Sequence, residues 1–321
     1  MNETVAAVVV TYNRKQLLTE CLDALLAQTR PVDKIILIDN ASTDGTPELL
    51  KEYGYLDNPV IDYVRLPENT GGAGGFYEGV KRGYEAGYDW MWLMDDDAEP
   101  MPDALEKMSP GFLIDGVLAV ANLKVSEDGT VQVQHRGWID LCRTDGEVIK
   151  SMSETQLTND VIAIEHASFV GLAVNKMVID KVGYPKKEFF IHYDDFYYCY
   201  MISKIGKIIL MRHSLIKHKD AAKKDTNKAS ILGRSSARVP LEKLWLSYFG
   251  LRNMVWMRKQ HCSNLALFFY VVKYYLRRCI GVILYDDHKL VRMNFYLNAI
   301  LDGWFGLFDN QKPRNITRVG S

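Results

Sequence analysis

The first hundred residues alternate between short apolar runs and stretches with the spacing of an amphipathic helix. Val5–Val10 and Ile35–Ile38 are continuous β-rich apolar runs, typical of strands buried on both faces of a parallel sheet. Between them, residues 16–27 place apolar side chains on one helix face. Ile61–Leu66 and Trp90–Met94 repeat the strand pattern. This order predicts an α/β fold with a mostly parallel central sheet and right-handed crossovers.

Two further helices are predicted between these strands. Thr46 is expected to be the N-cap of the first, with Pro47 at its first helical position. The glycine-rich segment 69–75 precedes the second, which is expected over roughly residues 76–86. Such a segment lets backbone approach a ligand and offers amides to phosphate. The dinucleotide-binding fingerprint fails, however, because Tyr77 occupies its third glycine position.

The pattern is less regular after residue 119, where a hairpin turn is predicted at Asp128-Gly129. The later elements are expected to be a strand over 168–174, a short helix from Asn175 to Gly183, a helix over 195–204 and a strand over 207–211. Residues 217–239 are polar and basic, which predicts a linker or mobile loop. Aromatic-rich helices are expected beyond Pro240.

The net charge of −1 hides a strong asymmetry along the 321 residues. Residues 1–200 hold 17 Lys and Arg against 33 Asp and Glu, whereas residues 201–321 hold 22 against 7. The basic C-terminal third indicates either an anionic partner or docking on the acidic part of the chain. No recognised nucleic-acid-binding motif accompanies this charge, so no nucleic-acid partner is expected.

The five cysteines are odd in number and show no CxxC spacing. We therefore expect no disulfide framework and no zinc site, and we expect a reducing cytosol. The N-terminus carries no signal-peptide pattern. No apolar stretch reaches the roughly 18 residues needed to span a bilayer, since Lys273, Arg277 and Arg278 interrupt the segment Leu265–Tyr285.

Asp95, Asp96 and Asp97 follow directly on the fourth predicted strand. Ligands of such sheets bind beyond the carboxyl ends of the strands, where Asp39 and Asn69 are also expected to lie. Three adjacent carboxylates repel one another unless a cation compensates, which favours a Mn²⁺ or Mg²⁺ site that binds a diphosphate. The alternative is an acidic turn that caps the next helix.

Three other acidic or imidazole positions are candidates with structural alternatives. Asp39 either accepts hydrogen bonds from a ribose or base, or initiates a turn. Asp195 is either a general base on an acceptor hydroxyl or, with Asp194, an N-cap. His218 is either a metal or diphosphate ligand or an exposed histidine in basic sequence.

The ordered set of these motifs resembles glycosyltransferase family 2, the inverting enzymes with a GT-A fold, from about Thr4 to His218. The segments that carry the resemblance are Val9-Val10-Thr11-Tyr12-Asn13-Arg14, Ile38-Asp39-Asn40-Ala41-Ser42-Thr43-Asp44-Gly45-Thr46, Asn69-Thr70-Gly71-Gly72-Ala73-Gly74-Gly75, Trp92-Leu93-Met94-Asp95-Asp96-Asp97, Gly171, Gly183, Asp194-Asp195, Gly206 and His218. One departure is Met201, at a position where the family commonly has an arginine that contacts phosphate.

The resemblance implies roles for particular residues. The nucleotide-sugar donor would be contacted by Thr11, Tyr12, Arg14, Asp39, Asn40, Asn69, Gly72, Asp95 and Asp96. Asp95, Asp97 and His218 would hold Mn²⁺ or Mg²⁺, and Asp195 would be the catalytic base. Asp96 would face the donor sugar or shape the turn.

The resemblance also divides the chain into a GT-A catalytic domain over 1–218, a basic linker or mobile loop over 219–239 and a helical region over 240–321. The catalytic domain would bind nucleotide through about 1–110 and acceptor through about 111–218. The glycine-rich and acidic motifs are similar to those of bacterial galactofuranosyltransferases and rhamnosyltransferases, which favours UDP-galactofuranose over dTDP-rhamnose. A sugar nucleotidyltransferase or a non-catalytic nucleotide-binding protein is a more distant alternative.

In such enzymes the glycan acceptor commonly rests on a lipid carrier, which suits a basic C-terminal third. The segment Leu265–Leu284 is then expected either in an anionic membrane interface or packed on the core or on a second subunit of a homo-oligomer. The expected location is cytoplasmic, peripheral on the inner face of the plasma membrane.

Overall fold

A computed structural model describes residues 3–144, 147–219, 227–231 and 234–318. The chain forms two compact units, described here as unit 1 and unit 2. Unit 1 comprises Met1–Ile139, Ile149–Lys187 and Asp194–Ala221. Unit 2 comprises Asp140–Val148, Glu188–Tyr193 and Ala222–Ser321. Two short inner segments thus belong to unit 2 in addition to the C-terminal region, and the predicted boundary after residue 218 stays a prediction.

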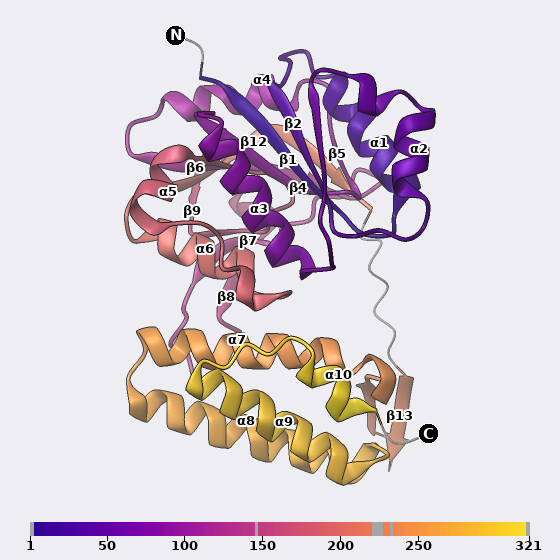
Figure 1. Ribbon diagram of the computed structural model, residues 1–321. Coiled ribbons are helices and arrows are strands. Elements are labelled where there is room, and N and C mark those ends of the chain that lie inside the picture. The colour runs from indigo at the N-terminus through magenta and orange to yellow at the C-terminus, as the bar shows by residue number, and fades with distance from the viewer. Residues whose placement is uncertain (1–2, 145–146, 220–226, 232–233, 319–321) are drawn as a thin grey trace. The chain divides into compact units, whose positions relative to one another are not determined.

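A mixed nine-stranded sheet forms the centre of unit 1 (Figure 1). Its strands are β1 (Val5–Thr11), β2 (Lys34–Asp39), β3 (Ile61–Arg65), β4 (Trp90–Asp95), β5 (Ala98–Pro100), β6 (Val117–Val125), β9 (Val161–Ile164), β11 (Leu172–Asn175) and β12 (Lys207–His218). The order is β3-β2-β1-β4-β11-β6-β12-β5, with β9 also paired to β12. The first four neighbours run parallel, whereas β11 is antiparallel to both β4 and β6. The predicted α/β class is confirmed.

A smaller sheet in unit 1 consists of β7 (Arg136–Ile139), β8 (Ile149–Ser151) and β10 (His166–Ala167). The helices of unit 1 are α1 (Lys15–Leu26), α2 (Thr46–Glu52), α3 (Gly71–Glu85), α4 (Ala104–Met108), α5 (Lys176–Val182) and α6 (Asp194–Ser203). Short 3₁₀ turns lie at Tyr55–Asp57, Ser109–Leu113, Glu154–Gln156, Lys187–Phe189 and Leu241–Lys243.

Strand β1 is buried along its whole length because helices cover both faces of the sheet. Its alternate side chains enter different cores. Val5, Ala7 and Val9 pack with side chains of α1 and α4, whereas Ala6, Val8 and Val10 pack with side chains of α3 and α6. This is why the sequence of β1 is continuously apolar and not alternating.

Helix α3 corrects the prediction of a glycine-rich loop over 69–75, because the helix begins at Gly71. Its glycines serve close packing on the sheet. A Cβ on Gly75 would lie 2.5 Å from a methyl of Val10, and one on Gly79 would lie 2.2 Å from a methyl of Val8. Gly72 differs from these two, since nothing lies within 4 Å of a Cβ placed there.

The start of α2 is displaced by one residue from the prediction. Gly45, with φ of 86°, is the N-cap, and Thr46 is the first helical residue. The Asp44 carboxylate accepts hydrogen bonds from the Thr46 amide at 3.2 Å and from its hydroxyl at 2.6 Å. Asp44 therefore satisfies the helix start that Thr46 was expected to cap.

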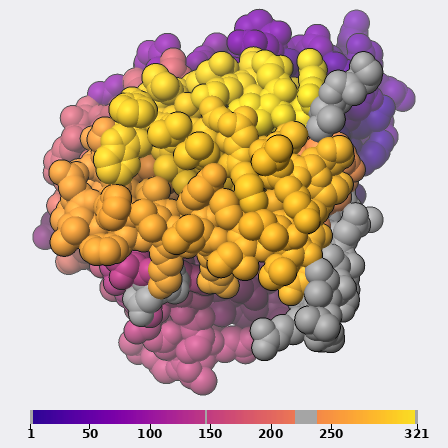
Figure 2. Space-filling model, turned by 90° about the horizontal axis from the view of Figure 1, so that it is seen from below, coloured from indigo at the N-terminus to yellow at the C-terminus, as the bar shows by residue number. Residues whose placement is uncertain are grey.

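Unit 2 contains the helices α7 (Trp245–His261), α8 (Asn264–Tyr285), α9 (Lys289–Phe305) and α10 (Lys312–Thr317), which confirms helices beyond Pro240. Their apolar core includes Tyr248, Leu267, Val282 and Phe295. Figure 2 shows the orange surface of α8 beside the yellow surface of α9. Within the described part of the chain, no helix has the length and apolarity to cross a membrane.

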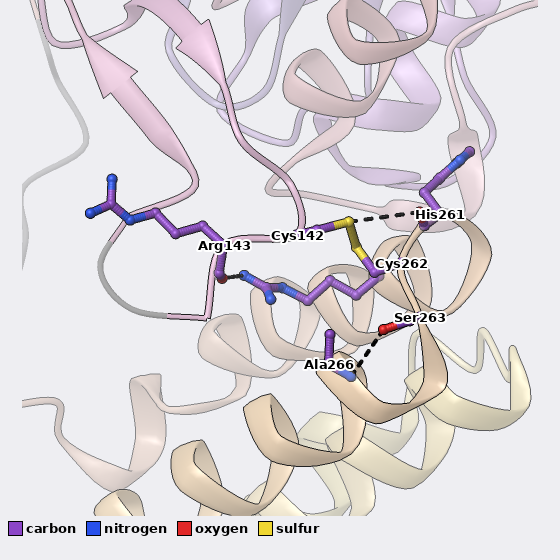
Figure 3. The surroundings of a disulfide bond; sticks show 7 residues. Cys142, Arg143, His261, Cys262, Ser263 and Ala266 are labelled. Carbon is purple, nitrogen blue, oxygen red and sulfur yellow. Dashed lines mark hydrogen bonds between the residues drawn. A yellow bond between two sulfur atoms is a disulfide. The ribbon is translucent and has the colours of Figure 1, made fainter.

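A disulfide joins Cys142 to Cys262 inside unit 2, which corrects the expectation of no disulfide (Figure 3). Cys142 lies in the 140–148 segment, and Cys262 is the C-cap of α7. Nearby, the guanidinium of Arg258 donates to the carbonyl of Arg143 at 2.6 Å. Residues 120 positions apart show no recognisable spacing in the sequence, so only the fold could reveal the pair. The cysteines consequently give no support to a reducing compartment.

Strands β13 (Asn227–Ile231) and β14 (Arg234–Arg238) pair antiparallel within the region expected to be a linker or mobile loop. Residues 220–226 and 232–233 of that region lie outside the described residues. Its mobility therefore stays a prediction.

Replacing Gly79 by alanine is expected to destabilise the protein, because the new methyl would overlap Val8. Overpacking costs about 1–3 kcal/mol, and the gain in helix propensity of up to about 1 kcal/mol offsets only part of it. The urea midpoint of unfolding measures the net loss. Gly72→Ala in the same helix is the control and should leave the midpoint unchanged or slightly raised. Equal midpoints for the two variants would contradict the packing role of Gly79.

Candidate active site

The carboxyl ends of β1, β2 and β4 meet at one edge of the sheet. Register places Thr11 opposite Asp39 and Val10 opposite Asp95. Asp96 therefore follows β4 next to the end of β1, where its carboxylate accepts a hydrogen bond from the Thr11 hydroxyl at 2.8 Å. The predicted convergence of these strand ends is thus present in the structure.

Asp96 organises the chain that leaves β1. Its carboxylate accepts hydrogen bonds from the Tyr12 amide at 3.4 Å and from the Arg14 guanidinium at 3.2 Å. Burial raises the pKa of Asp96 to about 6, although Arg14 and the Thr11 hydroxyl oppose this change. The Tyr12 side chain remains 43% exposed. These contacts support the turn-shaping role for Asp96 and leave the Tyr12 ring available to a ligand.

Arg14 connects Asp96 to Asp97, since its Nη1 also lies 3.2 Å from an Asp97 carboxylate oxygen. Burial disfavours the charge on Arg14, but the carboxylates of Asp96, Asp97 and Asp95 outweigh burial and raise its pKa. One guanidinium thus offsets part of the repulsion within the acidic cluster.

Asp95, Asp97 and His218 form a group suited to a cation. One ligand atom from each can be chosen so that all lie within 4.8 Å of one another. His218 reaches Asp97 because the end of β12 pairs with β5, which places His218 opposite Ala98. Its Nε2 lies 3.2 Å from Asp97 Oδ1. Two carboxylates and one imidazole are a chemically reasonable donor set for a divalent ion.

The electrostatics of the cluster also fit a cation. Burial, followed by repulsion from Asp97 and Asp96, raises the pKa of Asp95 above its ordinary value. Carboxylates confined in this way are stabilised in their ionised form when a divalent cation lies between them. The residues present therefore satisfy both the geometry and the charge that such a site requires.

The side chains of Asp39 and Asn40 form hydrogen bonds with the neighbouring segments. Asp39 is fully buried and accepts hydrogen bonds from the Ser42 amide at 2.8 Å and the Tyr63 hydroxyl at 2.7 Å. Asn40 donates to the Gly71 carbonyl at 2.9 Å and accepts from the Thr70 amide at 2.8 Å. Asp39 thus performs the turn-forming role considered from the sequence, and contact of either residue with a nucleotide stays a prediction.

Asn69 and Gly72 lie at the start of α3. The Asn69 side chain accepts a hydrogen bond from the Gly71 amide at 2.8 Å, so it forms part of the helix entry. Gly72 is half-buried and faces open space. Both residues lie beside Thr70 and Gly71, to which the Asn40 side chain is hydrogen-bonded. This is the sheet edge where the donor contacts are predicted.

Asp194 and Asp195 are the first residues of α6 and belong to unit 1 with the acidic cluster. Burial and the neighbouring Asp195 raise the pKa of Asp194, and Asp95 adds to this effect. The pKa of Asp195 is also raised by burial, while the Phe196 amide, which donates to it at 2.6 Å, and Arg136 oppose the rise. Asp194 is buried and Asp195 half-buried, and a raised pKa is the direction that favours a carboxylate as a general base near neutral pH.

Arg136 acts on the charge of Asp195, and the sequence did not predict it as a site residue. Its guanidinium is fully buried and donates to the carbonyls of Asn122 at 3.0 Å and Val170 at 2.7 Å and to the Ser168 hydroxyl at 3.1 Å. Burial lowers its pKa to about 10, against the favourable charge of Asp195. It lies in the irregular stretch after residue 119, where no periodicity or motif distinguished it from a surface arginine.

Met201 lies on α6, where the family pattern would place an arginine. A methionine supplies no positive charge to a phosphate. Arg14 does pair with Asp96 and Asp97 of the acidic cluster, and Lys219 pairs with the neighbouring Glu99.

Residues 6–181, more than half of the chain, match the sequence model of glycosyl transferase family 2. The chain belongs to this family. The resemblance proposed from its motifs is thus confirmed.

Curated relatives match over shorter lengths. The galactofuranosyltransferase GlfT1 of Mycolicibacterium smegmatis is 41% identical over 99 residues, which are 30% of this chain and 31% of the relative. GlfT1 of Mycobacterium tuberculosis is 41% identical over 97 residues, with the same two shares. The poly-β-1,6-N-acetyl-D-glucosamine synthase of Staphylococcus aureus is 30% identical over 110 residues, 34% of this chain and 26% of the relative. The matches thus span about a third or less of these relatives.

Solved structures support the GT-A fold over nearly the whole chain. GalNAc-T7 with UDP, GalNAc and Mn²⁺ has a TM-score of 0.58 at 15% identity, over 95% of this chain and 56% of that one. Residues 1–349 of TarS from S. aureus have a TM-score of 0.57 at 14% identity, over 94% of this chain and 80% of that one. At these identities the likeness concerns the fold alone.

Replacing Asp194 by asparagine is expected to stabilise the protein increasingly as pH rises. Folding raises the pKa of the Asp194 carboxyl, so the folded protein binds this proton more tightly than the unfolded chain does. The stability of the folded state therefore falls as pH rises through the folded pKa. Asparagine does not titrate. The free-energy advantage of Asp194→Asn should therefore grow by about 1–3 kcal/mol between pH 5 and pH 8, measured by urea unfolding. The exposed Asp115→Asn is the control, and an advantage independent of pH would contradict this account.

Proposed function

We propose that this glycosyltransferase moves a sugar from a nucleotide-sugar donor to a glycan hydroxyl in a single displacement with inversion. The main support is one combination in unit 1, in which the Asp95, Asp97 and His218 group accompanies the acidic pair Asp194-Asp195 at the start of α6. A glycosyl transfer needs these two kinds of group, one at the leaving diphosphate and one at the attacking hydroxyl.

In this proposal Asp195 accepts the proton of the acceptor hydroxyl as its oxygen bonds to the anomeric carbon. The bond from that carbon to the diphosphate oxygen breaks at the same time, and the nucleoside diphosphate leaves. Asp95, Asp97 and His218 would hold a divalent cation, which would supply positive charge to a departing diphosphate. Arg14 and Asp96 hold the end of β1 so that Thr11 and Tyr12 lie beside the donor.

Mn²⁺ suits the three side chains better than Mg²⁺ does, because Mg²⁺ binds almost entirely through oxygen and His218 offers nitrogen. UDP-galactofuranose is the proposed donor, supported by the galactofuranosyltransferases among the relatives. A dTDP-rhamnose donor is the alternative. The proposed acceptor is a glycan of cell-surface polysaccharide on a lipid carrier, and the polysaccharide synthase among the relatives is consistent with such a pathway.

A membrane-bound acceptor also accounts for the surface of α8. Eight large apolar side chains of this helix are exposed, namely Leu265, Phe268, Phe269, Val272, Leu276, Ile280, Ile283 and Leu284. Lys273 and Arg277 on the same helix are exposed as well. An apolar stripe with adjacent cations complements the interface of an anionic membrane. We therefore propose that α8 lies in that interface, on the cytoplasmic face of the plasma membrane.

Asp97→Asn is expected to remove Mn²⁺-dependent donor binding. With UDP at about 100 times its Kd, mass action stabilises the wild-type protein by about 2.7 kcal/mol, which appears as an increase in Tm. UDP should stabilise more than dTDP or GDP, and EDTA should abolish the increase. Asp97→Asn should lose the Mn²⁺-dependent part, whereas Asp103→Asn, at a half-buried position that pairs with Lys107, should keep it.

Asp195→Asn completes this test by separating donor binding from transfer. It should retain the increase in Tm with UDP and Mn²⁺ while losing at least about 100-fold in turnover of UDP-galactofuranose. Near-normal turnover in Asp195→Asn would remove the residue from its role as base. Full turnover of the wild-type protein in EDTA would refute the metal assignment.

The membrane proposal predicts co-sedimentation with vesicles of phosphatidylglycerol but much weaker binding to phosphatidylcholine, with the difference reduced by salt. Phe268→Ser with Ile280→Ser should reduce binding, since both side chains are more than half exposed. The exposed Leu113→Ser in unit 1 is the control. A stable dimer that the double substitution dissociates, with no vesicle binding, would show instead that a second copy covers α8.

A further inference from the structure

The six residues before the acidic pair have an unusual backbone. Phe190, His192 and Tyr193 have φ values of 63°, 70° and 65°. This left-handed region disfavours residues with a Cβ, and such residues persist only where the surroundings hold them. Tyr193 is followed directly by Asp194, the first residue of α6. The segment 188–193 thus leads into the acidic pair in a conformation that must be imposed on it.

Asn253 of α7 holds this segment from within unit 2. It is fully buried, and its Nδ2 lies 3.0, 3.2 and 2.9 Å from the carbonyl oxygens of Phe189, Ile191 and His192. His192 itself has a left-handed φ, and Phe189 and Ile191 are the two neighbours of Phe190, which also has one. A single side-chain amide therefore donates to three backbone carbonyls of an irregular segment.

Arg252 supports the same segment from the preceding position of α7. Its Nη2 donates to the carbonyls of Glu188 at 2.9 Å and Phe189 at 3.2 Å. Its Nε donates to the side-chain oxygen Oδ1 of Asn253 at 3.1 Å, which orients the Asn253 amide toward the segment 188–193. Its Nη1 donates to the side chain of Asn310 at 2.9 Å. The guanidinium is fully buried, and its hydrogen bonds go to neutral oxygens.

Aromatic rings of α7 also contact the side chains of this segment. The Phe190 ring stacks on Phe249 with centroids 4.8 Å apart, and the Phe189 ring meets Trp256 edge-on at 5.7 Å. The Arg252 guanidinium lies 5.0 Å from the centroid of Phe249. Helix α7 thus holds both the backbone and the side chains of 188–193.

We infer that Arg252 and Asn253 are positioning residues for the acidic pair Asp194-Asp195. They keep Phe190, His192 and Tyr193 in the left-handed conformation from which the chain enters α6, and that entry sets the direction of the first two carboxyls of the helix. This inference rests on the proposed role of Asp195. Both residues lie beyond 6–181, the segment that matches the family, so the C-terminal region contributes to catalysis through the backbone.

Asn253→Asp tests this role, because aspartate keeps the shape of asparagine but replaces the amide donor by a carboxylate that repels three carbonyls. The expected result is a fall in kcat of about 10- to 100-fold, typical of a catalytic group displaced by about 1 Å. KM for the donor and the increase in Tm with UDP and Mn²⁺ should be unchanged, because the donor side of unit 1 is untouched. The pH at which kcat rises on the acidic side should also shift, since the environment of Asp195 changes.

Asn294→Asp is the matched control, since Asn294 is exposed on α9 of the same unit and kcat should stay at the wild-type value. Adding His192→Gly to Asn253→Asp should recover part of kcat, because glycine adopts positive φ without help. Unchanged kcat in Asn253→Asp overturns the inference. So does a loss that appears only in donor KM.

Two results separate this inference from the proposed function. If Asp195→Asn keeps normal turnover, the role of the base fails and the inference fails with it. If Asp195→Asn is inactive while Asn253→Asp has wild-type kcat, only the positioning role fails. Should Asn253→Asp not fold, Asn310→Ala replaces it, because it removes only an acceptor of Arg252. A several-fold lower kcat at unchanged donor KM supports the inference, and wild-type kcat contradicts it.

Discussion

The repulsion among three carboxylates at the end of β4 is the constraint on which the site depends. Asp96 and Asp97 are buried, and Asp95 is half-buried beside them. Arg14 offsets two of these charges, and the Thr11 hydroxyl and Tyr12 amide bind the carboxylate of Asp96. The hydrogen bonds that stabilise Asp96 therefore also hold the segment after β1 in place. This segment, where donor contacts are proposed, is thus linked directly to the acidic cluster. A divalent cation held beside Asp95 and Asp97 would neutralise further negative charge in this cluster.

Much of the fold could be predicted from the sequence because burial on both faces leaves a strong signal. The continuous apolar runs of β1, β2 and β4 identified the parallel strands, and parallel pairing then placed their polar ends together. Asn175 and Gly183 were recognised as the ends of α5 because capping is a local property. The acidic cluster was found for the same reason, since its three members are adjacent in the chain.

The failures share a physical cause, which is that the deciding contact is distant in sequence. Residues 71–75 were expected in a loop but form the start of α3, where the close approach of the helix to Val10 explains Gly75. The Cys142–Cys262 disulfide and the burial of Arg136 likewise depend on elements that no local pattern connects. Arg252 and Asn253 had no signal at all, because their partners are backbone carbonyls, which every residue possesses.

We propose that Asp95, Asp97 and His218 hold the catalytic cation. Anomalous diffraction from crystals grown with Mn²⁺ and UDP, recorded at the manganese absorption edge, would locate that cation. We expect a single strong anomalous peak in contact with the carboxylate oxygens of Asp95 and Asp97 and a ring nitrogen of His218. A peak bound elsewhere, or bound UDP with no manganese at these three side chains, would contradict it.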